Sequence, residues 1–453
     1  MGREKNKRNK KGCGCRQRER EVNRVSSLDQ PNMERSRSRT RSRSYVPQDL
    51  LEDILVRLPV KPIIRFKCLN KLCYTLFQNP TFIAKHHSFQ SQNNPNLVVQ
   101  GLGYQKSHQF FTLLHLIHSD NDPGVSLDMH NVSLDIRKYY FTYRRLLEYI
   151  CDCINGIFCI GNETNGFVLW NPAMREYKVV PKPPRRRRRY PSEGNTTCVF
   201  GYDHNSNDFK LVRIENLRSR TEYKIRHLNE ILHPIVHVYN LSTNSWRLIH
   251  TATFFDRLIT RLDFFGLDFF GDFNEIYFNG VYHCFGIFTN KRGRHGRVIV
   301  SFNMRDEMFR IIWMPDLYVK NSAKKKEGLS VLRNCLALII YDMHSSLTEE
   351  IIDIWMMNEY GVEESWTKKF VIGPHSPVEL PLHVPWLDCL LRLGRQHCWG
   401  KRIKNEGPIL FYDFGTQKMK KLQFTNHHDL LHVLGAIVYV ESLVSVKGGI
   451  KCL

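Results

Sequence analysis

Residues 45–83 read YVPQDLLEDILVRLPVKPIIRFKCLNKLCYTLFQNPTFI, and this stretch decides how the N-terminal part of the chain folds. Its first apolar residues recur at helical spacing, which places them on one face of a helix. These residues are Leu50, Leu51, Ile54, Leu55 and Leu58. Pro59 ends this helix, and Val60–Pro62 are expected to turn the chain. A second stripe from Ile63 to Phe77 predicts a second helix, and a third begins near residue 81.

A helical unit of about 40 residues rarely stabilises itself without disulfides, a metal or a partner. The apolar residues lie on more than one side of the expected helices, so some of them should face another chain or another domain. The plainer alternative is a helical hairpin that caps a larger domain of the same chain.

The stretch resembles an F-box, the helical motif that docks substrate receptors onto the Skp adaptor of cullin–RING ubiquitin ligases. The matching positions are Pro47, Leu50-Leu51, Ile54-Leu55, Leu58–Val60, Arg65–Cys68 and Lys71. The resemblance implies that the apolar contacts to the adaptor come from Pro47, Leu50, Leu51, Ile54, Leu55, Leu58, Pro59, Val60 and Leu69. Cys73 stands where the family usually has Trp, and its smaller volume predicts weaker adaptor binding.

The net charge of +22 over 453 residues is concentrated in short segments. Residues 1–44 carry 15 Lys and Arg against 5 Asp and Glu, and Arg185–Arg189 add five more positive charges. The N-terminal segment is low in complexity and has too few apolar residues to form a core, so we expect residues 1–44 to be a disordered tail. Such basic segments keep open the alternative of a nucleic-acid-binding protein.

The 13 cysteines are scattered singly, and we find neither a secretory signal nor an apolar run that reaches the ~18 residues of a membrane span. The cysteines therefore favour a reduced, cytoplasmic or nuclear protein without a membrane segment. Cys13-Gly14-Cys15 and Cys151–Cys153 are isolated pairs, whereas a zinc site usually takes four ligands. We expect no metal and no cofactor.

Residues 97–446 follow a different pattern, in which short alternating strands pair across polar turns. One composite unit recurs about every 55–70 residues: an alternating strand, a turn with Asn or Asp, and a second strand entered by an aromatic or large apolar residue. The five units start at Phe167, His237, Ile299, Ile351 and Ile409. The turn Asn and Asp are expected to tolerate left-handed backbone. Asn155-Gly156 and Asn279-Gly280 mark two further hairpins of type I′.

Repeated four-stranded units favour a β-propeller of about six blades over a β-sandwich. The chain is therefore expected to be mainly β, with a disordered basic tail (1–44), a three-helix F-box (45–90) and a propeller-like domain (97–446). Several motifs resemble the plant F-box-associated interaction domain of F-box/kelch-type and S-locus F-box proteins. They are Cys153–Gly156, Leu169–Pro172, Phe200–Asp203, Asn207–Val212, Asn244–Trp246, Tyr360–Thr367 and Tyr439–Leu443.

The resemblance implies a non-catalytic adaptor subunit that binds Skp, and through it cullin and a RING protein, and holds an unidentified protein substrate. No nucleophile elbow, phosphate-binding glycine loop or metalloprotease motif is present in the sequence. An enzyme built on a propeller would need convergent polar groups at its central channel.

Two surface segments are candidates for target binding. Prolines on both sides favour an exposed loop for Arg185, Arg186, Arg187, Arg188, Arg189 and Tyr190, which could meet an acidic patch on the target protein. The aromatic and acidic insertion at 263–273 is either a strand and loop of one blade or part of a binding surface. A solvated charge run remains the alternative for the arginines.

Overall fold

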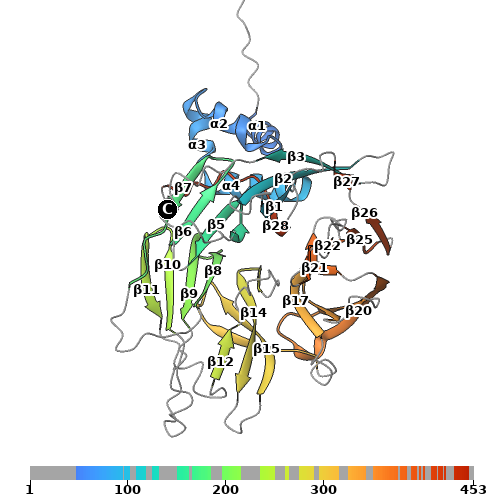
Figure 1. Ribbon diagram of the computed structural model, residues 1–453. Coiled ribbons are helices and arrows are strands. Elements are labelled where there is room, and N and C mark those ends of the chain that lie inside the picture. Colours follow the sequence, from blue (N-terminus) through green and yellow to red (C-terminus); the bar gives the residue numbers. More distant parts are fainter. Residues whose placement is uncertain are drawn as a thin grey trace, which may run out of the picture. The chain divides into compact units, whose positions relative to one another are not determined.

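The computed structural model describes most of the chain after residue 46 (Figure 1). The described ranges are 47–94, 96–102, 109–118, 125–131, 150–162, 166–184, 196–215, 235–249, 261–264, 275–289, 295–315, 325–342, 350–375, 378–384, 389–394, 397–398, 401–402, 410–415, 417–421, 423–424 and 433–447. Within these ranges, no helix combines the length and the apolar character needed to cross a bilayer.

Four helices open the described chain: α1 (Gln48–Val56), α2 (Val60–Phe66), α3 (Lys71–Leu76) and α4 (Pro80–Asn93). The prediction of a single helix from Ile63 to Phe77 is wrong, because a turn at 67–70 separates α2 from α3. Asn70 caps α3 through a side-chain oxygen that accepts from the backbone N–H of Cys73 at 2.7 Å. Val60–Pro62 do not turn the chain. They form the first turn of α2, where proline is tolerated because the amide has no intrahelical partner.

Six sheets of four or five strands follow, each made mainly from neighbouring strands of the sequence. The first holds β1 (Asn96–Leu102), β2 (Gln109–His118), β3 (Val125–Asn131), β27 (Gln423–Phe424) and β28 (Val433–Tyr439). The second holds β4 (Ile150–Ile154), β5 (Ile157–Asn162), β6 (Gly166–Asn171) and β7 (Glu176–Val179). The third holds β8 (Thr196–Asp203), β9 (Asp208–Glu215), β10 (Ile235–Asn240) and β11 (Ser245–Ile249).

The fourth sheet holds β12 (Arg261–Phe264), β13 (Glu275–Phe278), β14 (Val281–Thr289), β15 (His295–Asn303) and β16 (Phe309–Trp313). The fifth holds β17 (Lys325–Leu332), β18 (Cys335–Asp342), β19 (Glu350–Met357) and β20 (Trp366–His375). The sixth holds β21 (Val378–Val384), β22 (Cys389–Gly394), β25 (Leu410–Asp413) and β26 (Lys418–Lys421). A two-stranded ribbon joins β23 (His397–Cys398) and β24 (Lys401–Arg402).

This arrangement confirms the propeller-like expectation. The five recurring units are the hairpins β6–β7, β10–β11, β15–β16, β19–β20 and β25–β26, and each forms one edge of its own sheet. The strands at the opposite edge touch the next sheet, as β4 touches β8 and β17 touches β21. Each sheet is therefore one blade. A β-sandwich would have placed these hairpins in only two sheets.

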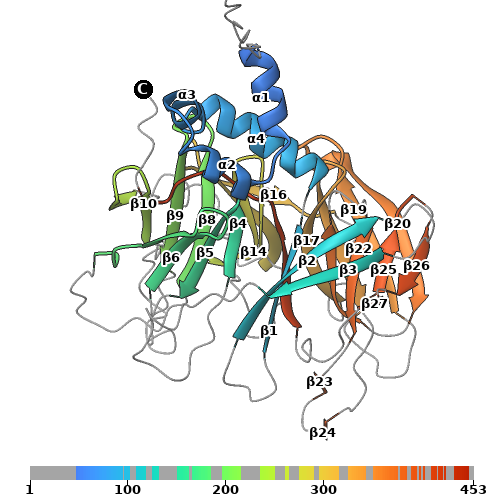
Figure 2. The same cartoon turned by 90° about the horizontal axis from the view of Figure 1, so that it is seen from above.

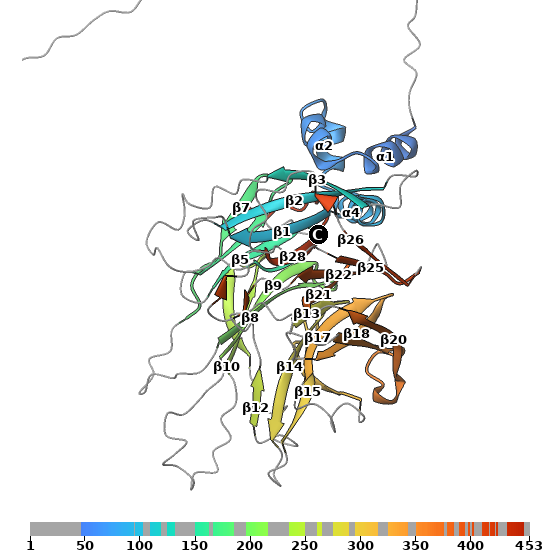
Figure 3. The ribbon, with the colours of Figure 1, turned by 45° about the vertical axis from the view of Figure 1, so that its right-hand side comes forward.

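The first blade joins the two ends of the β domain. Its strand β1 pairs antiparallel with β2 on one side and with β28 on the other. Figure 3 shows β1, β2 and β28 side by side. The complete sheet therefore needs strands from both ends of the domain.

The tight turns confirm one expectation and correct another. Asn155-Gly156 and Asn279-Gly280 both have left-handed backbone, as a type I′ turn requires. In the recurring hairpins, however, the left-handed residue comes later than the recurring Asn or Asp: it is Asn244 after β10 and Glu307 after β15. The recurring Asn instead bonds locally, as when Asn303 accepts from the backbone N–H of Arg305 at 2.8 Å.

Candidate functional site

The first candidate surface is the outward side of α1 (Figure 2). Leu50 and Ile54 lie four residues apart, hence on the same side of the helix. Their exposed fractions are 53% and 48%, whereas Leu55 and Val56 on the inward side are only 4% exposed. Covering these exposed apolar side chains with a partner would be favourable, because it removes apolar area from water.

A second exposed apolar group lies at the turn after α2 and on α3. Leu69 is 67% exposed, Leu72 is 46% exposed and Tyr74 is 50% exposed. Basic side chains of the same segment, Lys61 and Arg65 on α2, are also exposed. This part of the helical region therefore offers apolar contacts beside positive charge.

The residues predicted to contact the adaptor divide into three groups. Pro47, Leu50, Ile54, Pro59 and Leu69 are exposed, and Leu51 and Leu58 are half-buried. Leu55 and Val60 are buried within the helical cluster. In this structure they hold the helices together, and their contact with the adaptor stays a prediction.

Cys73, which stands at the family's usual Trp position, also lies inside this cluster and is 7% exposed. Its small side chain therefore affects first the packing of the helices against one another. Whether it also weakens adaptor binding stays a prediction.

Helix α4 supports α1 through its polar side chains. The His86 Nε2 atom lies 2.9 Å from the carbonyl oxygen of Leu58. The Gln90 amide donates to the carbonyl groups of Val56 and Leu58, each at 3.1 Å. These contacts satisfy carbonyl groups that the end of α1 leaves without intrahelical partners. Burial lowers the pKa of His86, although the hydrogen bond to Leu58 and the charge of Glu441 oppose this effect. The neutral ring therefore donates from Nε2.

The residues after β28, Val440–Val446, run beneath the helices and are called the C-terminal strap below. The Glu441 Oε2 atom accepts a hydrogen bond from the backbone N–H of Val60 at 2.9 Å. Leu443 is 2% exposed and belongs to the same apolar cluster as Leu55 and Val60. The motif Tyr439–Leu443 carries part of the family resemblance, but its spacing does not indicate contact with helices almost 400 residues away in the sequence.

The strap is attached to the second blade. The Asn171 side-chain amide donates to the carbonyl oxygens of Ser442 at 2.9 Å and Val444 at 2.7 Å. The Glu176 carboxylate accepts from the Ser445 hydroxyl at 2.6 Å and from the backbone N–H of Val446 at 3.1 Å. The strap therefore lies between helices and sheet and is bonded to both.

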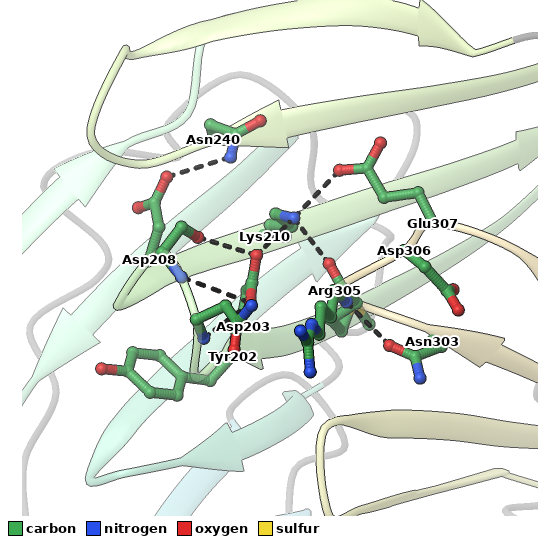
Figure 4. Close-up of polar contacts among 12 residues, drawn as sticks. Tyr202, Asp203, Asp208, Lys210, Asn240, Asn303, Arg305, Asp306 and Glu307 are labelled. Atoms are coloured by element: carbon green, nitrogen blue, oxygen red, sulfur yellow. Dashed lines mark hydrogen bonds and ion pairs between the residues drawn. The ribbon is translucent and has the colours of Figure 1, made fainter.

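A buried polar network links the third and fourth blades (Figure 4). Lys210 is 4% exposed and donates through Nζ to Asp203 Oδ2 at 2.8 Å, to Glu307 Oε1 at 2.9 Å and to the carbonyl oxygen of Met304 at 2.5 Å. Burial alone would raise the pKa of Asp203, but hydrogen bonds from Lys210 and Ser206 lower it below its usual value. The motifs Phe200–Asp203 and Asn207–Val212 thus supply a joint between blades.

This network is suited to holding blades together rather than to catalysis. Its amine has three acceptors, so no lone pair is available for nucleophilic or general-base chemistry. In the part of the chain that the structure describes, no three His, Cys, Asp or Glu side chains gather as a metal site would require. The described surface carries exposed apolar side chains on α1 and α3 and exposed basic side chains on α2.

Three predicted features lie partly or wholly outside the described residues. They are the tail at 1–44, the run from Arg185 to Tyr190, and most of the insertion at 263–273, of which only Asp263 and Phe264 at the end of β12 are described. The predictions for these segments stay predictions.

Comparison with known proteins agrees with this geometry. The F-box associated beta propeller domain matches residues 118–446. The chain is 25% identical to "F-box protein CPR1" of Arabidopsis thaliana over 338 residues, which is 72% of this chain and 73% of that protein. A putative F-box protein of the same plant is 26% identical over 374 residues, covering 81% and 79% of the two chains.

Among solved structures, a Hadza microbial sialidase has a distant likeness to this chain, with a TM-score of 0.34 and 11% identity, covering 77% of this chain and 64% of that one. The family match spans most of the six blades, and the four helices that precede it fit an F-box. The chain therefore belongs to the plant F-box proteins that carry an F-box associated β-propeller domain.

Proposed function

We propose that this chain is a substrate-recognition subunit of an SCF-type cullin–RING ubiquitin ligase. Helices α1–α3 bind the Skp adaptor, and the β domain holds a target protein. The chain itself makes and breaks no covalent bond. It raises the effective concentration of target lysines beside the activated ubiquitin.

The observation that carries this proposal is the exposure of Leu50 and Ile54 on a helix whose other side is packed. In a chain that used its helices only as a cap, these side chains would be covered by its own β domain. They are about half exposed instead. The family membership supplies the partner, since F-box proteins are generally adaptors.

The test compares three full-length chains. One is unaltered, one carries both Leu50→Asp and Ile54→Asp and is the α1 variant, and one carries Val371→Asp. Val371 is 57% exposed on β20, so it is a matched change at an exposed apolar site far along the chain. We expect the α1 variant to lose adaptor affinity at least about 30-fold, the factor that corresponds to ~2 kcal/mol at a hot spot. The Val371 variant should bind like the unaltered chain. Equal binding by all three chains, measured by calorimetry with purified adaptor, would refute the proposal.

The target-binding surface remains a prediction from the sequence. The run Arg185–Arg189 with Tyr190 is proposed to meet an acidic patch on the target. Neutralising the five arginines should reduce target capture and leave adaptor binding unchanged. Loss of both activities would indicate a folding defect instead, and capture of the same targets as before would remove the run from the binding surface.

A further inference from the structure

The apolar cluster of the helices includes one large residue that the helices do not supply. Nine buried residues come from α1–α4 and the turn after α3, and the tenth is Leu443 of the C-terminal strap. Val444 of the strap and Ala173 and Met174 of the β6–β7 turn pack around the same cluster. A helical unit of this size has little apolar area to bury by itself, so a residue from outside adds to its stability.

The start of α2 also depends on the strap, which supplies the capping hydrogen bond. Pro59 stands at the N-cap position and makes no side-chain capping hydrogen bond. The backbone N–H of Val60 is instead satisfied by the Glu441 carboxylate, 381 residues further along the chain. Since Val60 is fully buried, loss of this acceptor would leave a buried donor without a partner.

The strap is in turn fixed by the sheet beneath it. Besides the bonds from Asn171 and to Glu176, the backbone approaches Gly156 very closely: a Cβ atom there would lie 2.5 Å from both the Ser442 Cβ and the Val440 carbonyl oxygen. A position held on both sides in this way leaves the strap little freedom to shift along the helices.

We propose that the F-box helices and the C-terminal strap form one cooperative unit, so that the helices reach their adaptor-binding form only when the strap is in place. The strap follows β28, the strand that completes the first blade, and is therefore the last part of the described chain to be synthesised. Chains that stop within the β domain would then not present the α1 surface and would not occupy the adaptor. This consequence for adaptor binding rests on the function proposed above, whereas the dependence of the helices on the strap does not.

The test uses full-length chains with Leu443→Ala, with Glu441→Ala, which removes the acceptor of the Val60 N–H, and with Leu338→Ala as the matched control. Leu338 on β18 is as buried as Leu443, but it belongs to the core between the fourth and fifth blades. Hydrogen exchange followed by mass spectrometry reports the opening of each region separately. We expect amide exchange in 48–93 to be at least tenfold faster with Leu443→Ala and at least threefold faster with Glu441→Ala, while the fifth blade keeps its protection.

Leu338→Ala should show the reverse pattern, with faster exchange in the fifth blade and unchanged helices. Two results would overturn the proposal: helix exchange that stays at the unaltered rate in both strap variants, or helix exchange that rises equally with Leu338→Ala. Adaptor affinity measured on the same proteins separates the two hypotheses. A chain that never binds the adaptor refutes the proposed function, but its exchange pattern still decides whether the strap supports the helices.

Discussion

Replacing Lys210 with methionine tests the joint between the third and fourth blades. The new side chain keeps most of the apolar length and removes the ammonium group. Asp203, Glu307 and the carbonyl of Met304 then each lose a donor at 2.5–2.9 Å. Removing one partner of a buried ion pair costs about 3–5 kcal/mol, because the remaining charge stays buried without compensation.

The remaining contacts place the expected loss at the lower end of this range. Asp203 still accepts from the Ser206 hydroxyl at 2.7 Å and from the backbone N–H of Asn205 at 2.9 Å. Glu307 keeps its ion pair with Arg247. We therefore expect Lys210→Met to lower the free energy of unfolding by about 3 kcal/mol.

Lys368→Met is the matched control. Lys368 pairs with Asp353 at 2.8 Å, but its side chain is 41% exposed. An exposed pair is worth only about 0–1 kcal/mol. Urea unfolding followed by circular dichroism gives the free energy of unfolding of each variant. Equal slopes of this free energy against urea concentration would confirm that the variants share the same unfolded state. A difference between the two variants smaller than about 1 kcal/mol would show that Lys210 is not a buried pairing partner.

The stability costs of the two variants should depend differently on pH. Without the lysine, burial favours the protonated form of Asp203. The cost of Lys210→Met should therefore shrink as the pH falls toward 4, whereas the small cost of Lys368→Met should change little. A cost that stays constant over this pH range would indicate lost packing rather than an unpaired charge.

Two further predictions concern a buried histidine and a crowded glycine. Burial lowers the pKa of His283 to about 4, below its unfolded value of about 6.5, so the unfolded chain binds more protons between these values and stability falls with acidification. His283→Gln should remove up to about 3 kcal/mol of the loss measured between pH 7 and pH 4, and an unchanged loss would contradict this reasoning. Gly156→Ala should destabilise more than Gly166→Ala, because both have left-handed backbone but only the first would drive a Cβ atom into the strap; equal unfolding midpoints would contradict the close approach.

The sequence identified the helical motif but did not separate its two sides. The five leucines and isoleucines of residues 50–58 were assigned to one face. In the structure, the side with Leu50 and Ile54 is exposed and the side with Leu55 is buried. Successive helical residues are about 100° apart, so Leu50 and Leu55 lie roughly 140° apart around the axis. Helical periodicity shows that the helix carries a wide apolar arc, but only tertiary packing shows which part of the arc stays uncovered.

The strands were better predicted than the joints. Alternation and turn residues located the outer hairpin of five blades, because both signals are local in sequence. The cap of α2 by Glu441 and the bond from Lys210 to Glu307 join residues 381 and 97 positions apart. No local sequence pattern indicates such pairs, because they depend on how distant elements are arranged in space.

The motifs that carry the family resemblance lie at these joints. Gly156 and Asn171 hold the strap, and Asp203 and Lys210 hold two blades together. The fold restricts which residue types can make these contacts, whatever protein the β domain binds. Similarity at these positions therefore reports a common architecture and a common way of presenting the helices. Target choice should depend on residues outside these motifs, on connections that the scaffold leaves free to vary.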